Sequence, residues 1–216
     1  MQTLPLFQDE KTRYDILCLG AHSDDIEIGC GGTVLQLAQR YPNCVFHWVV
    51  FSATGARDGE ARRASELFAG ARIAKPLFKT FRDGFMPFVG AEIKMVFENE
   101  LKGLSPHLIF THNRKDAHQD HRLLAELTWN TFRNHLILEY EIPKYDGDMG
   151  QPNVFFALEP SICKKKVSNL MEAFESQRGK HWFREETFLG LMRLRGMECN
   201  APSGYAEAFY GRKLVL

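Results

Sequence analysis

The chain has 216 residues, which is enough for one α/β domain with a substantial core, whereas two full domains would each be small. Hydrophobic residues at 44% and charged residues at 25% are ordinary for a folded globular protein and exclude a disordered or membrane-embedded chain. Lys plus Arg and Asp plus Glu balance at 27 each, so no basic field exists to attract nucleic acid. We therefore expect one domain over residues 1–216 and no nucleic-acid partner.

The targeting signals that sequence can carry are not visible. No apolar run approaches the roughly 20 residues that a membrane-spanning helix needs. Segment 1–11 lacks the basic start and apolar centre of a secretory signal. The five cysteines are scattered without CxxC spacing, as is typical of reduced thiols. These features predict a cytoplasmic protein without a membrane span.

Apolar runs alternate with helical patterns at a period of roughly 30 residues, which is the period of a doubly wound sheet. Strands are predicted at 14–19, 44–51, 76–81, 107–111, 136–140 and 154–158, and helices at 33–40, 60–70, 91–101, 122–134, 164–174 and 185–195. The alternation predicts a Rossmann-like α/β fold in which helices flank a mostly parallel sheet.

A first polar cluster, Gly20-Ala21-His22-Ser23-Asp24-Asp25, directly follows the first predicted strand. The carboxyl ends of strands in an open α/β sheet form the crevice where ligands bind. His22 and Asp25 are three residues apart in a tight turn and can converge on one point. The side chains of adjacent Asp24 and Asp25 should diverge, so that one binds a metal ion and the other serves as a general base for water.

The glycines after this cluster, Gly29, Gly31 and Gly32, have two interpretations. A phosphate-binding loop is one, but the full G-x-G-x-x-G spacing is missing. The other is a glycine-rich entry into a crossover helix that begins near Thr33. We favour the second interpretation.

A second polar cluster, residues 112–122, follows the predicted strand at 107–111 and contains three histidines and two acids. His118 and His121 are three residues apart at a helix start and share one face. If one of them joins His22 and Asp25, the set has two histidines and one carboxylate with open positions, which suits catalytic zinc and also non-haem iron. The remaining histidine can stabilise an oxyanion or protonate a leaving amine. A solvated polar loop is the alternative for this cluster alone.

The two clusters together resemble the AHPDD and HxDH motifs of the LmbE-like, or PIG-L, family of zinc-dependent N-acetylglucosamine deacetylases, with Ser23 in place of the usual proline. The resemblance covers most of residues 14–125. It implies three metal ligands, a general base, and an oxyanion-stabilising histidine with an acid oriented against it. These are, in that order, His22, Asp25 and His121, then Asp24, then His118 with Asp120.

The resemblance also implies substrate-binding residues. Arg57-x-x-Glu60 and Arg82-Asp83-Gly84 match places where family members put sugar-binding side chains, so Arg57 and Asp83 are candidates. A surface ion pair or a turn residue is the simpler interpretation of each. The motifs occupy a core of about 14–134, and the part from about 135 to 216 is expected to shape the substrate pocket. Its segment 142–152 is rich in Pro, Gly and Asp and could overhang the site.

The expected function is therefore a zinc-dependent hydrolase that uses metal-activated water to remove an acetyl or other acyl group from an amino sugar or sugar conjugate. Fe²⁺ or another divalent metal could replace Zn²⁺ at such ligands. The expected partner is this small molecule, and an oligomer is left open. The alternatives are an amidase for a thiol-sugar or other amide conjugate, and a non-catalytic metal- or sugar-binding protein.

Overall fold

The computed structural model describes residues 5–215, and within them seven strands form one sheet in the order β3-β2-β1-β4-β5-β7-β6. The strands are β1 Tyr14–His22, β2 Cys44–Ser52, β3 Leu77–Phe78, β4 Leu108–His112, β5 Ile137–Tyr140, β6 Val154–Ala157 and β7 Ala206–Gly211. Pairing is parallel from β3 through β5, whereas β7 runs antiparallel to both of its neighbours. The predicted single α/β domain with a mostly parallel sheet is confirmed.

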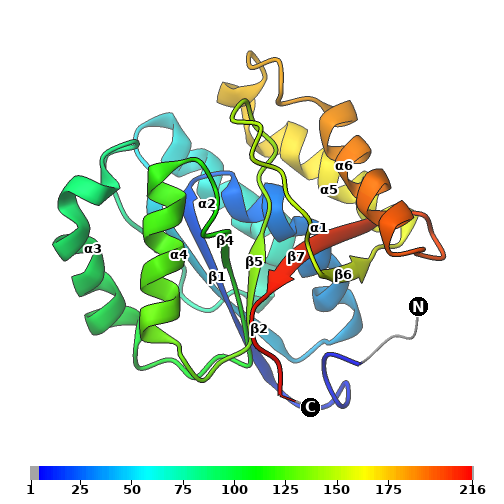
Figure 1. The fold of residues 1–216 in the computed structure, drawn as a ribbon, viewed down its shortest axis with the longest axis horizontal. Helices are drawn as coiled ribbons and strands as arrows, with labels where there is room; N and C mark the ends of the chain where they lie inside the picture. The colour runs from blue at the N-terminus through cyan, green and yellow to red at the C-terminus, as the bar shows by residue number, and fades with distance from the viewer. Residues whose placement is uncertain (1–4, 216) are drawn as a thin grey trace.

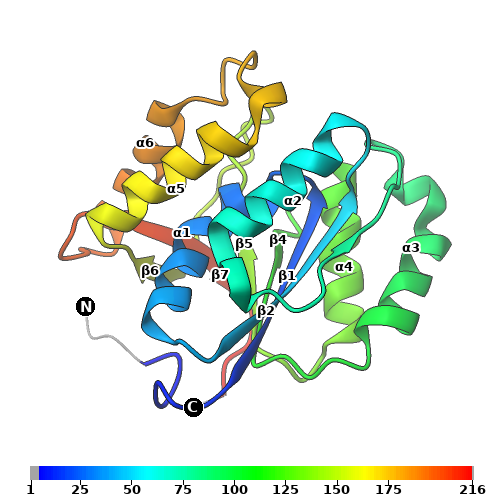
Figure 2. The ribbon, with the colours of Figure 1, turned by 180° about the vertical axis from the view of Figure 1, so that it is seen from behind.

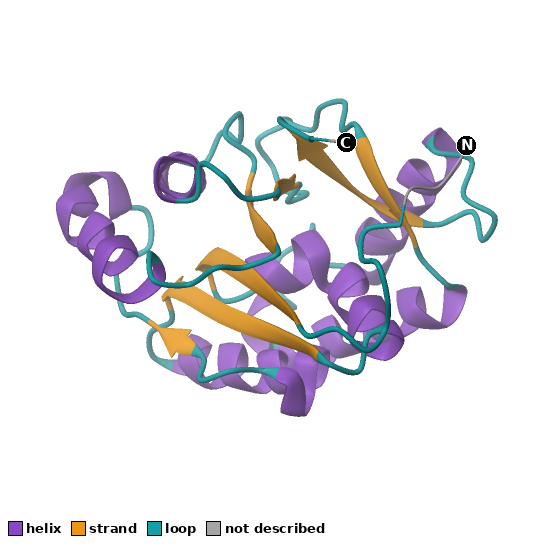
Figure 3. Cartoon of the chain, turned by 90° about the horizontal axis from the view of Figure 1, so that it is seen from below, coloured by secondary structure: helices purple, strands orange, loops and turns teal. Residues whose placement is uncertain are grey.

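Helices cover both faces of this sheet (Figure 1, Figure 3). The α-helices are α1 Asp25–Arg40, α2 Ala56–Ala69, α3 Gly90–Val96, α4 Gln119–Thr131, α5 Pro160–Ala173 and α6 Glu185–Glu198. Short helical segments are η1 Gly70–Arg72, η2 Met86–Val89, the π-helical η3 Phe97–Leu101 and η4 Glu175–Gln177. Helices α3 and α4 lie on one face, and Figure 2 shows α1, α2 and α5 on the other.

The alternation of side chains along β1 explains the two-sided core. Ile16 and Cys18 face the cluster that includes α1, α2 and α5, whereas Leu17 and Leu19 face the cluster that includes α3 and α4. Successive residues of a strand point to opposite faces, so a continuous apolar run is what a strand covered on both sides requires. The run that predicted this strand thus also fixes it in the middle of the sheet.

Helix α1 begins at Asp25, eight residues before the predicted start at Thr33, so Gly29 and Gly32 lie inside the helix. They are there because the helix packs closely on other elements. A Cβ at Gly29 would lie 2.3 Å from Cδ2 of Tyr140, and one at Gly32 would lie 2.7 Å from Cδ1 of Leu158. The glycines form a packing face rather than a phosphate-binding loop.

We predict opposite effects of alanine at two helical glycines. Gly29→Ala should lower the free energy of unfolding by about 1–3 kcal/mol, because its methyl group overlaps the buried Tyr140 ring. Gly59→Ala in α2 meets nothing within 4 Å and should raise it by up to about 1 kcal/mol through helix propensity. Urea unfolding of both variants checks this. An equal gain in stability for both would contradict the close packing of α1.

Two expectations concern the ends and edges of the chain. Among residues 5–215, no helix combines the length and apolar character needed to cross a bilayer. The interpretation of segment 1–11 rests partly on residues 1–4, which lie outside the described residues. Residues Ala206–Phe209, for which no strand was predicted, begin β7, which lies between β5 and the edge strand β6.

Candidate metal centre

The polar residues gather where β1 and β4 separate. Backbone pairing between these strands covers only Ile16–Cys18 with Leu108–Phe110. Beyond it the N–H of Ala21 donates to Nε2 of the His112 side chain at 2.9 Å. The order of the strands changes direction at this same place, from β3-β2-β1 on one side to β4-β5 on the other. Such a switch point is where an open α/β sheet forms a ligand crevice.

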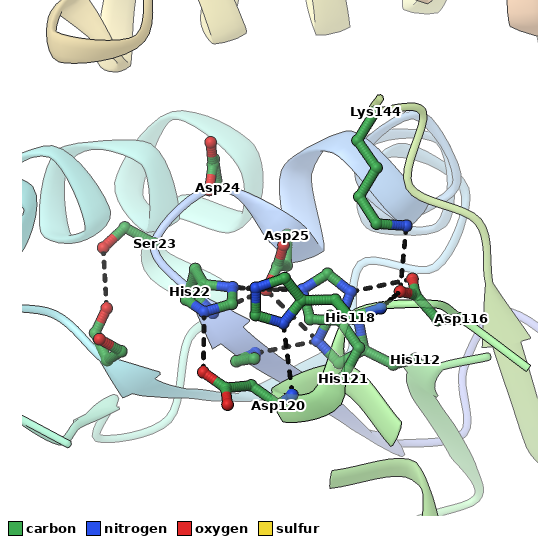
Figure 4. Close-up of polar contacts among 12 residues, drawn as sticks. His22, Ser23, Asp24, Asp25, His112, Asp116, His118, Asp120, His121 and Lys144 are labelled. Atoms are coloured by element: carbon green, nitrogen blue, oxygen red, sulfur yellow. Dashed lines mark hydrogen bonds and ion pairs between the residues drawn. The ribbon is translucent and has the colours of Figure 1, made fainter. Parts of the chain in front are cut away.

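The turn from β1 into α1 is closed by Asp25. The backbone N–H of His22 donates to Oδ2 of Asp25 at 2.6 Å, so the two side chains converge as their spacing predicted. Asp24 precedes the first turn of the helix, and its carboxylate points away from the histidine group in Figure 4. The adjacent acids therefore diverge, one toward the histidines and one away from them.

His121, in the first turn of α4, brings the second cluster to this point. Nδ1 of His22 lies 3.2 Å from Nε2 of His121 and 3.3 Å from Oδ2 of Asp25, and those last two atoms are 3.6 Å apart. All three side chains are at least about nine-tenths buried, with 11%, 3% and 5% of their surface exposed. Three donor atoms from two motifs, about 100 residues apart in the chain, thus form one small triangle.

Carboxylates behind the two imidazoles orient them. Nε2 of His22 lies 2.9 Å from Oδ1 of Asp83 and 3.3 Å from Oδ2 of Asp120. Nδ1 of His121 lies 2.9 Å from Oδ2 of Asp116. A neutral imidazole carries one ring proton. With that proton on the nitrogen facing Asp83 and Asp120 in His22, and Asp116 in His121, Nδ1 of His22 and Nε2 of His121 would present lone pairs toward Asp25. The triangle then consists of three acceptor atoms.

Three buried acceptors in contact need a positive charge between them. Burial alone would lower the pKa of His22, but Asp25 and then Asp120 raise it well above its usual range overall. Burial alone would raise the pKa of Asp25, but the histidines, His121 foremost, lower it well below its usual range. A proton on His22 supplies this charge, and a divalent cation would displace it.

The donor set fits a divalent cation of the zinc type. Ligands at about 2.0–2.1 Å from Zn²⁺ in tetrahedral arrangement lie about 3.3 Å apart, close to the observed edges of 3.2, 3.3 and 3.6 Å. Two imidazole nitrogens and one carboxylate oxygen leave a position open, as in catalytic rather than structural sites. The same donors also satisfy Fe²⁺.

Two neighbouring histidines offer further combinations, because His22, His118 and His121 also place nitrogens within 4.8 Å of one another, as do the donor atoms of Asp25, His112 and His121. His112 is a poor ligand since its Nε2 accepts the N–H of Ala21. Burial lowers its pKa to about 4, and its ring stacks on that of His121 at 3.9 Å. It therefore supports the ring of His121 from behind.

His118 caps the amino end of α4 and is set up as a donor. Its Nδ1 accepts the backbone N–H of Asp120 at 3.3 Å. Burial lowers the pKa of His118, and the neighbouring His121 and His22 lower it further. A neutral ring whose Nδ1 accepts must carry its proton on Nε2. That N–H has no partner among the hydrogen bonds of residues 5–215, so it can donate to an oxygen atom of a bound ligand.

Among residues 5–215, the carboxylate of Asp120 accepts no hydrogen bond from the His118 ring, although donor atoms of the two residues lie within 4.8 Å, so the expected role of Asp120 toward His118 stays a prediction. The carboxylate instead accepts the backbone N–H groups of Gly84 at 2.7 Å and Met86 at 3.1 Å, besides contacting His22. The reason is its place in the first turn of α4, which directs it toward the loop after β3. Asp120 thus joins that loop to His22, and its only hydrogen bond with His118 among the described residues runs through its backbone.

The two candidate substrate residues lie beside the triangle in different settings. Asp83 follows β3, keeps 67% of its side chain exposed, and contacts Nε2 of His22. That contact lowers the pKa of Asp83 to about 2. Nη2 of Arg57, in the first turn of α2, donates to Oδ1 of Asp24 at 2.5 Å. One nitrogen of Arg57 is therefore held by the expected base.

A sequence profile of the PIG-L family, described as GlcNAc-PI de-N-acetylase, matches residues 17–132, which is more than half of the chain. The chain belongs to the PIG-L family. The matched segment runs from β1 into the end of α4 and contains every residue of the triangle, so the expected family membership is confirmed and this is a member of a deacetylase enzyme family.

This PIG-L chain is similar in sequence to a curated relative and in fold to two solved structures. It is 28% identical over 176 residues to the uncharacterized deacetylase YaiS of Escherichia coli strain K12, a match that covers 76% of this chain and 93% of the relative. The N,N'-diacetylchitobiose deacetylase of Pyrococcus horikoshii superposes with a TM-score of 0.70 at 18% identity, covering 94% of this chain and 85% of that one.

The second structure, the 4-carboxy-2-hydroxymuconate hydratase GalB of Pseudomonas putida KT2440, superposes with a TM-score of 0.68 at 18% identity, covering 94% of this chain and 98% of that one. A deacetylase and a hydratase thus share this fold. Because the fold is common to both reactions, the reaction of this PIG-L chain has to be argued from its own site.

Three side chains at this site had no role in the sequence interpretation. They are His112, Asp116 and Lys144. His112 and Asp116 belong to the histidine-rich cluster, so the sequence shows their residue types but does not show which way their side chains point. Lys144 lies 28 residues beyond Asp116 in the segment predicted to overhang the site, and only the fold brings its ammonium to that carboxylate, at 3.0 Å.

Proposed function

We propose that this PIG-L chain is a metal-dependent hydrolase that removes an N-acetyl group from an amino sugar or sugar conjugate. The observation that carries the proposal is the triangle of Nδ1 of His22, Oδ2 of Asp25 and Nε2 of His121, with edges of 3.2–3.6 Å. Carboxylates fix both imidazoles with their lone pairs turned inward. In this proposal the three residues hold Zn²⁺, or another divalent cation with the same ligand preference.

A divalent cation held there would lower the pKa of a water molecule and polarise an amide carbonyl. Asp24 would take the proton of the attacking water. Its Oδ1 is bound to Arg57, and its Oδ2 accepts no hydrogen bond within residues 5–215, which leaves that oxygen to act as the base. As the C–N bond breaks, Asp24 would return the proton to the leaving nitrogen, so that an amide and water yield acetate and an amine.

His118 would stabilise the carbonyl oxygen as it gains negative charge. Its Nδ1 is occupied by the N–H of Asp120, so its donor is Nε2–H. A donor aimed at the developing oxyanion contributes more to the transition state than to the bound substrate. Asp120 would act through His22, whose orientation it fixes together with Asp83.

The substrate class is proposed from the family, from the structural neighbours, and from Asp83 and Arg57, which lie beside the triangle. The PIG-L description names a GlcNAc derivative, and a structural neighbour is named for diacetylchitobiose. The exposed carboxylate of Asp83 can accept hydrogen bonds from sugar hydroxyls, and Arg57 can donate to a hydroxyl or a phosphate. The part of the chain from 135 onward would complete the pocket.

Acetate release tests the proposal. We expect the purified chain to liberate acetate from a panel of N-acetylated amino sugars and their conjugates. Chelation followed by dialysis should abolish the release, and Zn²⁺ or Fe²⁺ should restore it, because the cation supplies the water activation. The metal that restores the highest rate identifies the preferred ion.

The same panel separates the alternatives. Release from a thiol-sugar conjugate alone would narrow the substrate to that class. Full activity after chelation would contradict metal dependence. Binding of metal and sugar without release of any acid from acetyl or longer acyl amides would favour a non-catalytic binding protein.

A further inference from the structure

The segment between β5 and β6, residues 141–153, is here called the strap. Its Lys144 extends from the strap into the site, as Figure 4 shows, and only 11% of its side chain is exposed. Nζ of Lys144 lies 3.0 Å from Oδ1 of Asp116 and 2.8 Å from Oδ2 of Asp148. Burial alone would lower the pKa of Lys144, but Asp148 and Asp116 raise it overall, so the strap delivers an ammonium group.

Asp116 stands between this ammonium group and the candidate metal ligand. Its Oδ2 faces Nδ1 of His121 at 2.9 Å, and its Oδ1 also accepts the backbone N–H of His118 at 2.7 Å. One carboxylate thereby orients His121, holds the backbone at His118, and receives Lys144. Any displacement of Asp116 would therefore shift both His121 and the backbone of His118.

Besides the Lys144–Asp116 contact, the strap is attached through Asp148 near the site and through Glu141 and Gly150 on the side of α6. Oδ2 of Asp148 accepts the N–H of Ala117 at 2.7 Å, so the Lys144–Asp148 pair grips the loop that leads to His118. On the far side, Arg195 of α6 binds both oxygens of Glu141 at 2.6 and 2.9 Å and the carbonyl of Gly150 at 3.1 Å. The strap is therefore fixed to the α6 side independently of Lys144.

We propose that Lys144 is a positioning residue that couples the strap to His121 through Asp116. This inference rests on the proposed function, because it assigns Lys144 an effect on metal binding at the triangle. The C-terminal part of the chain then contributes to the ligand set as well as to the walls of the pocket. Lys144 itself contacts none of the three triangle residues among the contacts described for residues 5–215.

A positioning role and a purely electrostatic role of Lys144 predict opposite changes in Zn²⁺ affinity when its charge is removed. A positive charge near a cation site repels the cation, so loss of the charge alone would strengthen metal binding. Loss of a positioning contact would instead loosen Asp116 and His121 and so weaken metal binding. Residues behind metal-ligating histidines typically change affinity by about 10–100-fold. The direction of the change is therefore decisive.

The experiment compares Lys144→Met and Lys144→Arg with the wild-type chain. Zn²⁺ affinity is measured by competition with a chromophoric chelator, and cleavage by chymotrypsin at Tyr145 reports how firmly the strap is held. We expect Lys144→Met to weaken Zn²⁺ binding by several-fold, up to about 10-fold because Lys144 acts through Asp116, and to speed cleavage, and Lys144→Arg to restore both in large part. Lys102→Met, which removes an exposed Lys102–Glu98 pair at the end of η3, should change neither.

The outcomes separate this inference from the proposed function. If wild-type chain binds Zn²⁺ and His121→Ala does not, the metal site stands, and unchanged or tighter binding by Lys144→Met overturns the positioning role. If wild-type and His121→Ala chains bind Zn²⁺ equally, the proposed triangle fails. The cleavage rate still judges the strap in that case, since equal rates for wild type and Lys144→Met would show that Lys144 does not hold it.

Discussion

Replacing His121 with alanine should reduce Zn²⁺ affinity by more than about 100-fold and lower acetate release to the level of chelator-treated wild type. The substitution removes one of three donor atoms in the triangle, whereas loss of a group behind a ligand already costs about 10–100-fold in affinity. It also leaves Asp116 without its imidazole partner. Equilibrium competition for Zn²⁺ and an acetate assay measure the two quantities.

His118→Ala is the matched control, because the two histidines are three residues apart and their rings stack with centroids at 4.5 Å. If His118 stabilises an oxyanion, its loss should lower kcat by about 10²–10³-fold with Zn²⁺ affinity nearly unchanged. Loss of Zn²⁺ by His118→Ala together with its retention by Asp25→Ala would assign the site to His22, His118 and His121 instead. Retention of Zn²⁺ by His121→Ala would contradict the triangle.

The sequence predicted strands at the places of β1 to β6, because the information that marks a strand is local, but it did not predict β7. The predicted runs of five to eight residues place the strand ends, and the strand ends of a parallel sheet share one edge. That argument predicts His22, Asp25 and the histidine-rich cluster at the same edge of the sheet. The structure puts donor atoms of His22, Asp25 and His121 within 3.6 Å of one another.

The predicted start of α1 was wrong. Glycine has low helix propensity, so the sequence pattern indicated a start at Thr33 and not at Asp25. Tertiary packing overrides that preference where a methyl group would strike Tyr140 or Leu158. The same stretch of α1 also has a distant partner, since the carboxylate of Glu207 accepts the N–H groups of Gly32 at 2.8 Å and of Thr33 at 2.6 Å. This acceptor is 175 residues away from Gly32 in the chain, beyond the reach of any local pattern.

The partners behind the histidines were hidden for a different reason. Asp116 and Asp120 both lie within five residues of His121, and sequence spacing alone does not say which imidazole each carboxylate will face. The helix start decides it, because Asp120 lies in the first turn of α4 and turns to Gly84 and Met86, whereas Asp116 lies in the preceding loop and faces His121. Residue types could be predicted, but side-chain direction depended on the helix boundary.

Asp24→Asn should lower kcat by about 10²–10⁴-fold while Zn²⁺ affinity stays close to that of wild type. Removal of a general base typically costs this much. Asp24 contacts none of the three triangle residues through its side chain among the hydrogen bonds described for residues 5–215. Asparagine keeps the shape and can still accept from Arg57, so the change isolates proton transfer. A kcat within about 10-fold of wild type would contradict the base role, since even the lower bound for base catalysis is larger.

Two further variants give the kinetic effect its meaning. Asp58→Asn, in the exposed Asp58–Arg62 pair of α2, makes the same chemical change away from the candidate metal ligands and should leave kcat unchanged. Arg57→Gln removes the guanidinium from Asp24. If Arg57 binds substrate, KM should rise more than kcat falls, because binding to ground and transition states is lost equally. A fall in kcat with constant KM would instead mean that Arg57 acts by orienting Asp24, to which it donates at 2.5 Å.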